Sequence, residues 1–333
     1  MLLSPRGARE LFKHALKNHY AVLAVNADSP AAVSDCLVAA LGCDAPIVIE
    51  ASLWQLEGRS FGAGNAIIGM ARYLASLATL AGSQRFLSIP VVFHIDHIKG
   101  PQTEEILAAG LRGLVLEVPD GSVTLHPSTI SLDSSDLSQQ QNIRLITALC
   151  DQAARAGVDV TLEMEAGIDA GLTPPDVTRN LLGEVERQHP GRVWLWAPGL
   201  GTKHGFSDDG YPAFSVETVA SQLKLAQQIT KREVGLALHG SSGLSEAALQ
   251  TGVAAGIVKV NWSSQSLLLR SAAAAEYYRT REGALSKDHP DFKVAAMDNG
   301  VQSYVGGQYV PVVSERIRLL GSAGQASAFV SQT

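Results

Sequence analysis

Three histidines stand in short polar motifs that follow apolar stretches of the chain. His97 ends the run PVVFHIDH, His204 lies in GLGTKHG, and His239 begins HGSSG directly after VGLAL. Three imidazoles with one coordination position left open are the ligand set of a catalytic zinc site. A histidine at a strand end often does no more than cap backbone groups. Three at corresponding positions, two of them followed directly by glycine, favour a metal site.

Carboxylates accompany these histidines. Asp96 precedes His97, so it can stand beside a metal-bound substrate without ligating the metal, and it could exchange a proton with a polarised substrate oxygen. Its structural alternative is a carboxylate bonded to a loop amide. Glu163 and Glu165 alternate with apolar neighbours and therefore share one strand face, where either could join a second metal site or orient a ligand histidine. His94 and His97 are three apart on a predicted strand and point to opposite faces, so we expect only one of them to face the mouth of a barrel directly.

Two further motifs suit a phosphate group. HGSSG and the later NWSS are small, hydroxyl-rich segments, each placed directly after an apolar run. As turn chemistry such segments are common. In a barrel, however, the loops after the last two strands frequently hold phosphate with backbone N–H groups and a helix N-terminus.

The elements that must position these groups alternate along the chain. Apolar, β-rich runs predict strands at 21–26, 46–52, 90–97, 113–118, 158–167, 192–199, 234–240 and 256–263. Alanine- and leucine-rich segments predict helices between them, such as 29–42, 65–82, 103–112 and 141–157. Apolar strands separated by helices indicate a parallel sheet buried on both faces, and eight such units predict an α/β fold of the (β/α)₈ barrel type. A doubly wound sheet is the rival, but no GxGxxG follows the first strand.

The barrel would bring the polar motifs together, because barrel chemistry lies at the C-terminal ends of the strands. Asn26 and Ser52 end the first two predicted strands, and Asn261 ends the last. His126 follows the predicted fourth strand, and we interpret it as a loop residue.

Composition excludes several other classes of protein. The 333 residues are 46% hydrophobic and 17% charged, with 32 acidic against 26 basic side chains and a net charge of −6. We therefore expect a large core and no nucleic-acid partner. Three cysteines without metal spacing suit a reducing compartment. The sequence shows no signal-peptide pattern and no apolar stretch of the roughly 18 residues that a membrane span needs, so a cytoplasmic protein that contacts no membrane is expected.

The last part of the chain has a different character. We assign residues 1–275 to the catalytic barrel and 276–333 to a helical extension, packed on the same domain or on a neighbouring subunit. Within the extension, DNGVQSYVGGQ predicts a glycine-containing turn before a helix at SERIRLLGSAGQASAF.

These motifs, in this order, resemble the class II (zinc-dependent) ketose-bisphosphate aldolases, which act on fructose and tagatose bisphosphates. The resemblance covers nearly the whole chain, from AVLAVN to RIRLLGSAGQA. Its most specific segments are HIDH, LEMEAG, GLGTKHG, ALHGSSG and KVNWS. It implies reversible aldol cleavage of a phosphorylated ketose to dihydroxyacetone phosphate, or a close relative, and an aldehyde, through an enediolate stabilised by zinc. A homodimer or homotetramer is also implied.

The resemblance assigns roles residue by residue. It implies one zinc ion on His97, His204 and His239, and Asp96 as the acid/base at the cleaved bond. Asp133, in SLDSSDLSQQQNI, and Glu165 become candidates for an alternative metal shell. The implied substrate contacts are Asn26, Ser52 and Asn261 for the triose part, and Gly205, Gly240, Ser242, Ser263 and Ser264 for the phosphate. A monovalent cation near the phosphate loop is implied as well.

The sequence departs from the family pattern in three places. Where the family has a mobile loop with a proton-carrying glutamate, this chain has GIDAGLTPPD, in which Asp169 or Asp176 could substitute. Ser263-Ser264 follow the bulky Trp262 where acidic or small residues and threonine are usual, and Asp208-Asp209 replace an apolar or aromatic turn. We therefore expect a substrate other than fructose 1,6-bisphosphate.

Three alternative functions stay open at this point. The same metal barrel could act as an epimerase, isomerase or dehydratase on a sugar phosphate. Lys259 could instead form a Schiff base, because a desolvated lysine can be a nucleophile. Finally, the barrel could be a non-catalytic aldolase-like subunit.

Overall fold

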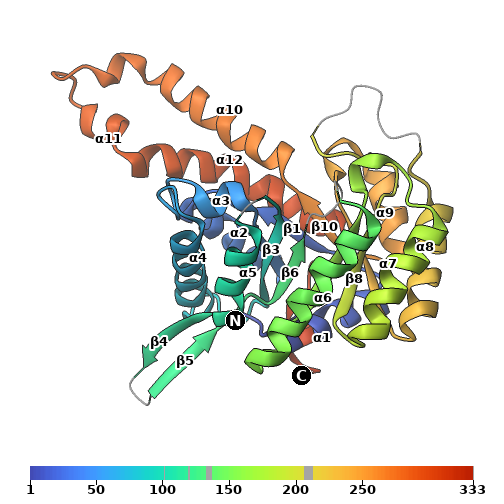
Figure 1. Cartoon of the computed structure of the whole chain (residues 1–333). Coiled ribbons are helices and arrows are strands. Elements are labelled where there is room, and N and C mark those ends of the chain that lie inside the picture. Colours follow the sequence, from blue (N-terminus) through green and yellow to red (C-terminus); the bar gives the residue numbers. More distant parts are fainter. Residues whose placement is uncertain (101, 119–120, 133–136, 206–212, 333) are drawn as a thin grey trace.

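The computed structural model describes residues 1–100, 102–118, 121–132, 137–205 and 213–332. Within them, eight parallel strands close into a barrel in the order β1-β10-β9-β8-β7-β6-β3-β2 (Figure 1). The barrel strands are β1 (Val22–Asn26), β2 (Ile47–Ala51), β3 (Val91–Ile98), β6 (Thr129–Leu132), β7 (Leu162–Ala166), β8 (Val193–Pro198), β9 (Gly235–Leu238) and β10 (Ile257–Trp262). The predicted (β/α)₈ barrel is confirmed, and the doubly wound alternative is wrong.

Helices cover the outside of the barrel. They are α2 (Pro30–Gly42), α3 (Leu53–Glu57), α4 (Ala66–Ala81), α5 (Thr103–Arg112), α6 (Gln139–Ala156), α7 (Pro175–Gln188), α8 (Val216–Thr230), α9 (Glu246–Ala254) and α10 (Ser264–Thr280). Serine caps begin several of them: Ser29, Ser138, Ser215 and Ser245 each accept a hydrogen bond from a first-turn N–H. Such caps satisfy backbone donors that a helix leaves unpaired, which places these helix starts at defined points after the strands.

The barrel interior has an apolar layer below a polar one. Helix α1 (Pro5–Lys17) contacts β9 and β10 and joins a buried cluster that includes Val22, Val48 and Val92. Further along the same strands, where side chains again point inward, polar residues follow: Asn26 on β1, Glu50 on β2, and His94 and Asp96 on β3. Glu50 and His94 are fully buried. The apolar layer excludes water from below, so the polar groups can be reached only from the C-terminal end of the barrel.

The predicted fourth barrel strand is wrong. β4 (Leu114–Val118) pairs in antiparallel fashion with β5 (Gly121–Leu125), and this hairpin projects from the barrel wall (Figure 1). The fourth position in the barrel belongs to β6, whose sequence TISL carries a weaker apolar signal than LVLEV. The apolar run LVLEV was misleading because a strand of a two-stranded hairpin can carry the same residues as a barrel strand.

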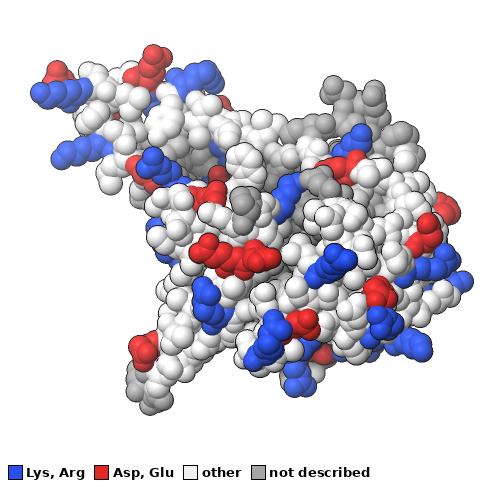
Figure 2. Space-filling view, in the orientation of Figure 1, with Lys and Arg blue, Asp and Glu red and all other residues white. Residues whose placement is uncertain are grey.

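The C-terminal part forms a helical arm, consisting of α10, η3 (Glu282–Leu285), α11 (Phe292–Ala296) and α12 (Asp298–Leu319), before α13 (Gln325–Val330). The arm extends beyond the barrel, and its far end carries acidic and basic side chains next to each other (Figures 1 and 2). Since α10 runs through residue 275, the last barrel helix is also the first helix of the arm.

The predicted turn at DNGVQSYVGGQ is wrong, because these residues lie inside α12. One of these glycines, Gly306, serves packing instead. A Cβ on Gly306 would lie 2.6 Å from Asp35 Oδ1 on α2, so this glycine lets α12 approach α2 closely. Gly307 has open space around it.

Candidate active site

Strand β3 delivers three of the polar side chains. Along a regular strand His94 and Asp96 would share the interior face and His97 would point outward. Instead, His97 has a left-handed backbone (φ 52°), and the pairing of β3 with β6 shifts register between Ile95 and Ile98. The Nε2 atoms of His94 and His97 therefore both approach Asp96 Oδ1, at 3.5 and 3.7 Å. His94 is fully buried, whereas His97 joins His204 and His239, so only one of the two faces the barrel mouth, and the bulge turns His97 inward to do so.

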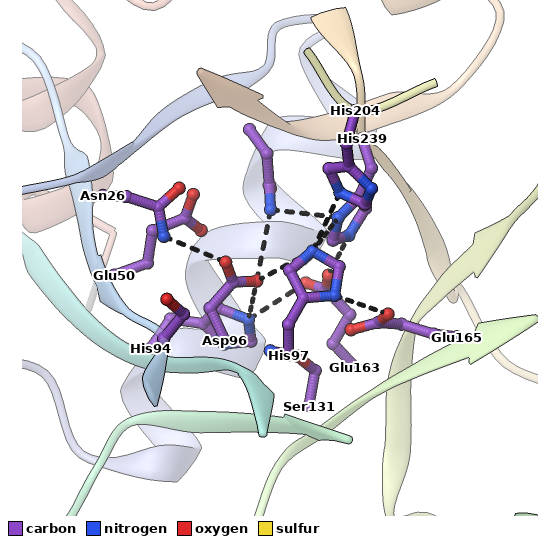
Figure 3. Close-up of polar contacts among 12 residues, drawn as sticks. Asn26, Glu50, His94, Asp96, His97, Ser131, Glu163, Glu165, His204 and His239 are labelled. Carbon is purple, nitrogen blue, oxygen red and sulfur yellow. Dashed lines mark hydrogen bonds and ion pairs between the residues drawn. The ribbon is translucent and has the colours of Figure 1, made fainter. Parts of the chain in front are cut away.

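His97, His204 and His239 converge at one point (Figure 3). The Nε2 of His97 lies 3.1 Å from Nε2 of His204 and 2.8 Å from Nδ1 of His239, and one nitrogen from each ring falls within 4.8 Å of the others. Two unprotonated ring nitrogens this close repel each other unless a proton or a cation lies between them. The donor set therefore fits a metal ion that prefers imidazole ligands, such as zinc.

Each of the three imidazoles has a carboxylate on its remaining nitrogen. Glu165 lies 2.8 Å from His97 Nδ1, Asp169 3.0 Å from His204 Nδ1, and Glu163 2.7 Å from His239 Nε2. Such partners fix the tautomer and ring orientation of a ligand histidine and raise its basicity. Glu163 and Glu165 do share one strand face, as predicted. Asp169, a candidate proton carrier, accepts hydrogen bonds from the backbone and the ring of His204.

Asp96 is held by two amides. Asn26 Nδ2 donates to Asp96 Oδ2 at 3.0 Å, and Asn261 Nδ2 donates to Oδ1 at 3.3 Å. Burial by itself would raise the pKa of Asp96, but the positive charge of His97 and the hydrogen bond from His94 outweigh it and hold that pKa well below its usual range. The carboxylate is thus ionised and fixed in direction, next to the three imidazoles.

Beneath Asp96 lies a cluster of buried charges that sequence reasoning only partly found. Lys259 Nζ contacts Glu163 Oε2 at 2.9 Å and Glu50 Oε2 at 3.2 Å, and all three side chains are fully buried. Burial would lower the pKa of Lys259, but Glu163 and Glu50 raise it above the usual value. The two carboxylates favour the protonated amine, which cannot attack a carbonyl, so the structure does not support the Schiff-base alternative. Glu50 was missed; its signal is a carboxylate in the middle of the apolar strand PIVIEA.

The residues predicted for phosphate binding lie in adjoining loops. Gly240 has φ 66°, and a Cβ there would lie 2.4 Å from the backbone oxygen of Lys203, so the loops after β8 and β9 touch at this glycine. Ser242, in η2 (Ser241–Gly243), accepts a long 3.4 Å hydrogen bond from the N–H of Gln265. Ser263 and Ser264 stand at the N-terminus of α10. Gly205 is the last described residue before the gap in the loop that follows β8. The contact of Ser242 with Gln265 places η2 beside the first turn of α10, where backbone donors favour an anion.

Other predicted residues are placed differently. The Ser52 hydroxyl donates to Gln55 Oε1 at 2.7 Å in the capping box of α3. Asp176 is exposed in the first turn of α7. Asp133 and Asp208-Asp209 lie outside the described residues.

Comparison with known proteins agrees with this geometry. The sequence profile of the family "Fructose-bisphosphate aldolase class-II" matches residues 6–325. The chain belongs to this family.

Individual aldolases are distant relatives. The chain is 30% identical to a fructose-bisphosphate aldolase of Aspergillus oryzae over 75% of its own length and 74% of that protein, and 24% identical to one of Streptococcus pneumoniae over 96% and 98%. Among solved structures, a fructose-bisphosphate aldolase of Campylobacter jejuni superposes with a TM-score of 0.79 at 15% identity, over 97% and 96% of the two chains. The YdjI aldolase of Escherichia coli gives 0.69 at 20%, over 98% and 100%.

Family membership establishes the class of chemistry. The protein is a metal-dependent aldolase, a carbon–carbon lyase whose family acts on sugar phosphates with a catalytic divalent metal. Across the described ranges, no helix has both the length and the apolar character needed to cross a membrane.

Proposed function

We propose that this aldolase reversibly cleaves a phosphorylated ketose into dihydroxyacetone phosphate, or a close relative, and an aldehyde, with one zinc ion held by His97, His204 and His239. The observation that carries the proposal is the convergence of three imidazoles, each with a carboxylate on its outer nitrogen. When bound, zinc would supply Lewis-acid stabilisation of the negative charge that develops on the ketone half of the substrate. We retain Glu165 and Asp133 as a proposed alternative metal shell.

In this proposal Asp96 moves the proton at the bond that is cleaved. Its two oxygens accept from Asn26 and Asn261, which leaves further lone pairs available to a substrate hydroxyl. An ionised, oriented carboxylate can take the hydroxyl proton as the carbon–carbon bond breaks and return it in the reverse reaction.

The phosphate would bind between the loops after β8, β9 and β10. We assign it to Gly205, Gly240, Ser242, Ser263 and Ser264, with the N-terminus of α10 supplying backbone donors. Asn26, Ser52 and Asn261 would contact the triose part. We also propose a monovalent cation near this phosphate. The substrate that we propose is one other than fructose 1,6-bisphosphate.

The test combines metal analysis with exchange of substrate protons. We expect about one zinc per chain by mass spectrometry and chelator-sensitive deuterium exchange into dihydroxyacetone phosphate. Zinc without exchange would point to a different head group, to isomerase-type chemistry or to a non-catalytic barrel, and absence of zinc would refute the histidine site.

Two variants separate the roles of the side chains. Asp96→Ala should keep its zinc and lose turnover by roughly 10²- to 10⁴-fold, the usual range for a proton-transfer residue. His204→Ala should lose zinc affinity and turnover together. Near-normal cleavage by Asp96→Ala would show that another group moves the proton.

We further propose that the chain assembles into a homodimer or homotetramer through the helical arm, in the cytoplasm. Val294 and Met297 on the arm are 68% and 57% exposed, although both are large apolar side chains. Glutamate at these two positions should lower the mass measured by light scattering, whereas Val123→Glu on the β4–β5 hairpin should not. An unchanged mass in the arm variant would exclude this surface.

A further inference from the structure

Lys259 is one of the largest fully buried side chains of the protein, and its ammonium group is completely occupied. It contacts Asn261 Oδ1 at 2.6 Å, Glu163 Oε2 at 2.9 Å and Glu50 Oε2 at 3.2 Å. Lys259 Nζ also donates to Glu163 Oε1 at 3.3 Å, so oxygens of three side chains surround an ammonium that can donate but cannot accept. A buried charge that is paired in this way is costly to place and leaves no donor for substrate.

The two shortest contacts of Lys259 are with Asn261 and Glu163, and each of these residues also contacts a side chain of the candidate active site. The Oε1 atom of Glu163 contacts Nε2 of His239 at 2.7 Å, and it also accepts a hydrogen bond from Lys259 Nζ at 3.3 Å. Because Lys259 keeps Glu163 ionised, that carboxylate can only accept, so His239 carries its proton on Nε2. The lone pair of Nδ1 then faces His97 and His204.

Asn261 is oriented by the same ammonium. Since Lys259 can only donate, it requires the amide oxygen of Asn261, and the NH₂ group must point the other way. There it lies 3.3 Å from Asp96 Oδ1 and 3.2 Å from His239 Nδ1. The second contact agrees with an unprotonated Nδ1.

From this geometry we infer that Lys259 is a positioning residue, which sets the tautomer of His239 through Glu163 and the direction of the Asp96 contact through Asn261. The inference rests on the proposed zinc site. It also accounts for the adjoining group Glu50, His94 and Asp96, whose ligand atoms lie within 4.8 Å of one another. The cation beside that group is the lysine ammonium, so no second metal is needed there.

Glu50 supplies a matched control. It contacts the same ammonium and is labelled in Figure 3, but among the described residues neither of its oxygens has a hydrogen-bond partner, and no ion pair joins it to His97, His204 or His239. Burial, followed by the charge of Asp96, raises the pKa of Glu50 to about 8. Removing Glu50 should therefore leave His239 in place.

The experiment measures zinc affinity by competition with a chromophoric chelator, using the full-length wild-type protein and variants. Lys259→Met should weaken zinc binding roughly 10- to 100-fold, the range for loss of a group that orients a ligand. Glu50→Gln should stay within about threefold of wild type. The double variant Lys259→Met/Glu163→Gln should bind no more weakly than the poorer single variant, because the lysine acts through the glutamate.

Each outcome decides between the two proposals. If wild type binds zinc and Lys259→Met binds equally well, or if the losses of the double variant simply add, the positioning role is wrong and the zinc site stands. If wild type binds no zinc, the zinc site itself fails. Should Lys259→Met not fold, Lys259→Met/Glu50→Gln removes one of the uncompensated carboxylates, and its zinc affinity is compared with that of Glu50→Gln.

Discussion

At the scale of single residues, each ring in the histidine cluster is constrained from two sides. The inner nitrogens face one another, and the outer nitrogens contact Glu163, Glu165 and Asp169. Two of these carboxylates are almost fully buried, whereas Asp169 is exposed in η1 (Ile168–Ala170). Asp169 thus restrains the most exposed histidine of the cluster from a short 3₁₀ segment.

Asp169→Asn should weaken zinc binding by about tenfold, because the carboxylate that orients His204 and raises its basicity becomes a neutral amide. Chelator competition measures the affinity. Asp176→Asn, an exposed carboxylate seven residues later, should leave it unchanged. Normal zinc affinity in Asp169→Asn with slowed proton exchange of the ketone would instead return Asp169 to the role of proton carrier.

At the scale of elements, close approach explains features that composition suggests are turns. Tyr309 of α12 stacks on Trp262 at the end of β10, with ring centroids 6.0 Å apart and planes 9° apart. Gly306, one turn earlier, lies against Asp35 of α2, which pairs with Arg270 of α10. Helix α12 therefore joins the arm to the strand that carries Lys259 and Asn261.

Gly306→Ala and Gly307→Ala should have opposite effects on stability. The new Cβ at Gly306 meets Asp35 Oδ1 at 2.6 Å and forces the α2–α12 contact apart, whereas the Cβ at Gly307 meets open space and gains helix propensity of about 1 kcal/mol. Thermal melting should show a lower Tm for the first variant and an equal or higher Tm for the second. A lower Tm for Gly307→Ala alone would contradict the packing explanation.

At the scale of the whole molecule, the barrel, the arm and the β4–β5 hairpin depend on one another to different degrees. The arm shares α10 with the barrel, so it cannot be removed without exposing β10. The hairpin pairs its strands only with each other among the described residues, and its base is narrow because Leu114 and Leu125 are paired. It should therefore be separable from the rest of the fold.

Replacing residues 114–125 by a short Gly-Ser linker should leave a folded barrel with unchanged zinc affinity. Circular dichroism and chelator competition measure the two properties, and the matched control is the wild-type chain. Loss of cooperative unfolding in the shortened chain would show that the hairpin supports β6, whose Thr129 bonds His94 and whose Ser131 accepts from the His97 N–H.

The sequence alone was sufficient to determine the barrel, its open end and the family, because these follow from local signals. Apolar strands, alanine-rich helices and the motifs HIDH, GLGTKHG and ALHGSSG are each contained in a few neighbouring residues. The histidine set could be predicted for the same reason, since strand ends of a barrel meet at one edge.

Only the tertiary structure decided which neighbours these groups have. The inward turn of His97 depends on the register shift between β3 and β6. That β6 and not β4 completes the barrel depends on which of the two strands forms hydrogen bonds with β3. The contacts of Lys259 with Glu50 and Glu163, and of Asp96 with Asn261, join strands far apart in the chain. Such pairings depend on register and on buried charge rather than on local periodicity, and no pattern within one strand specifies them.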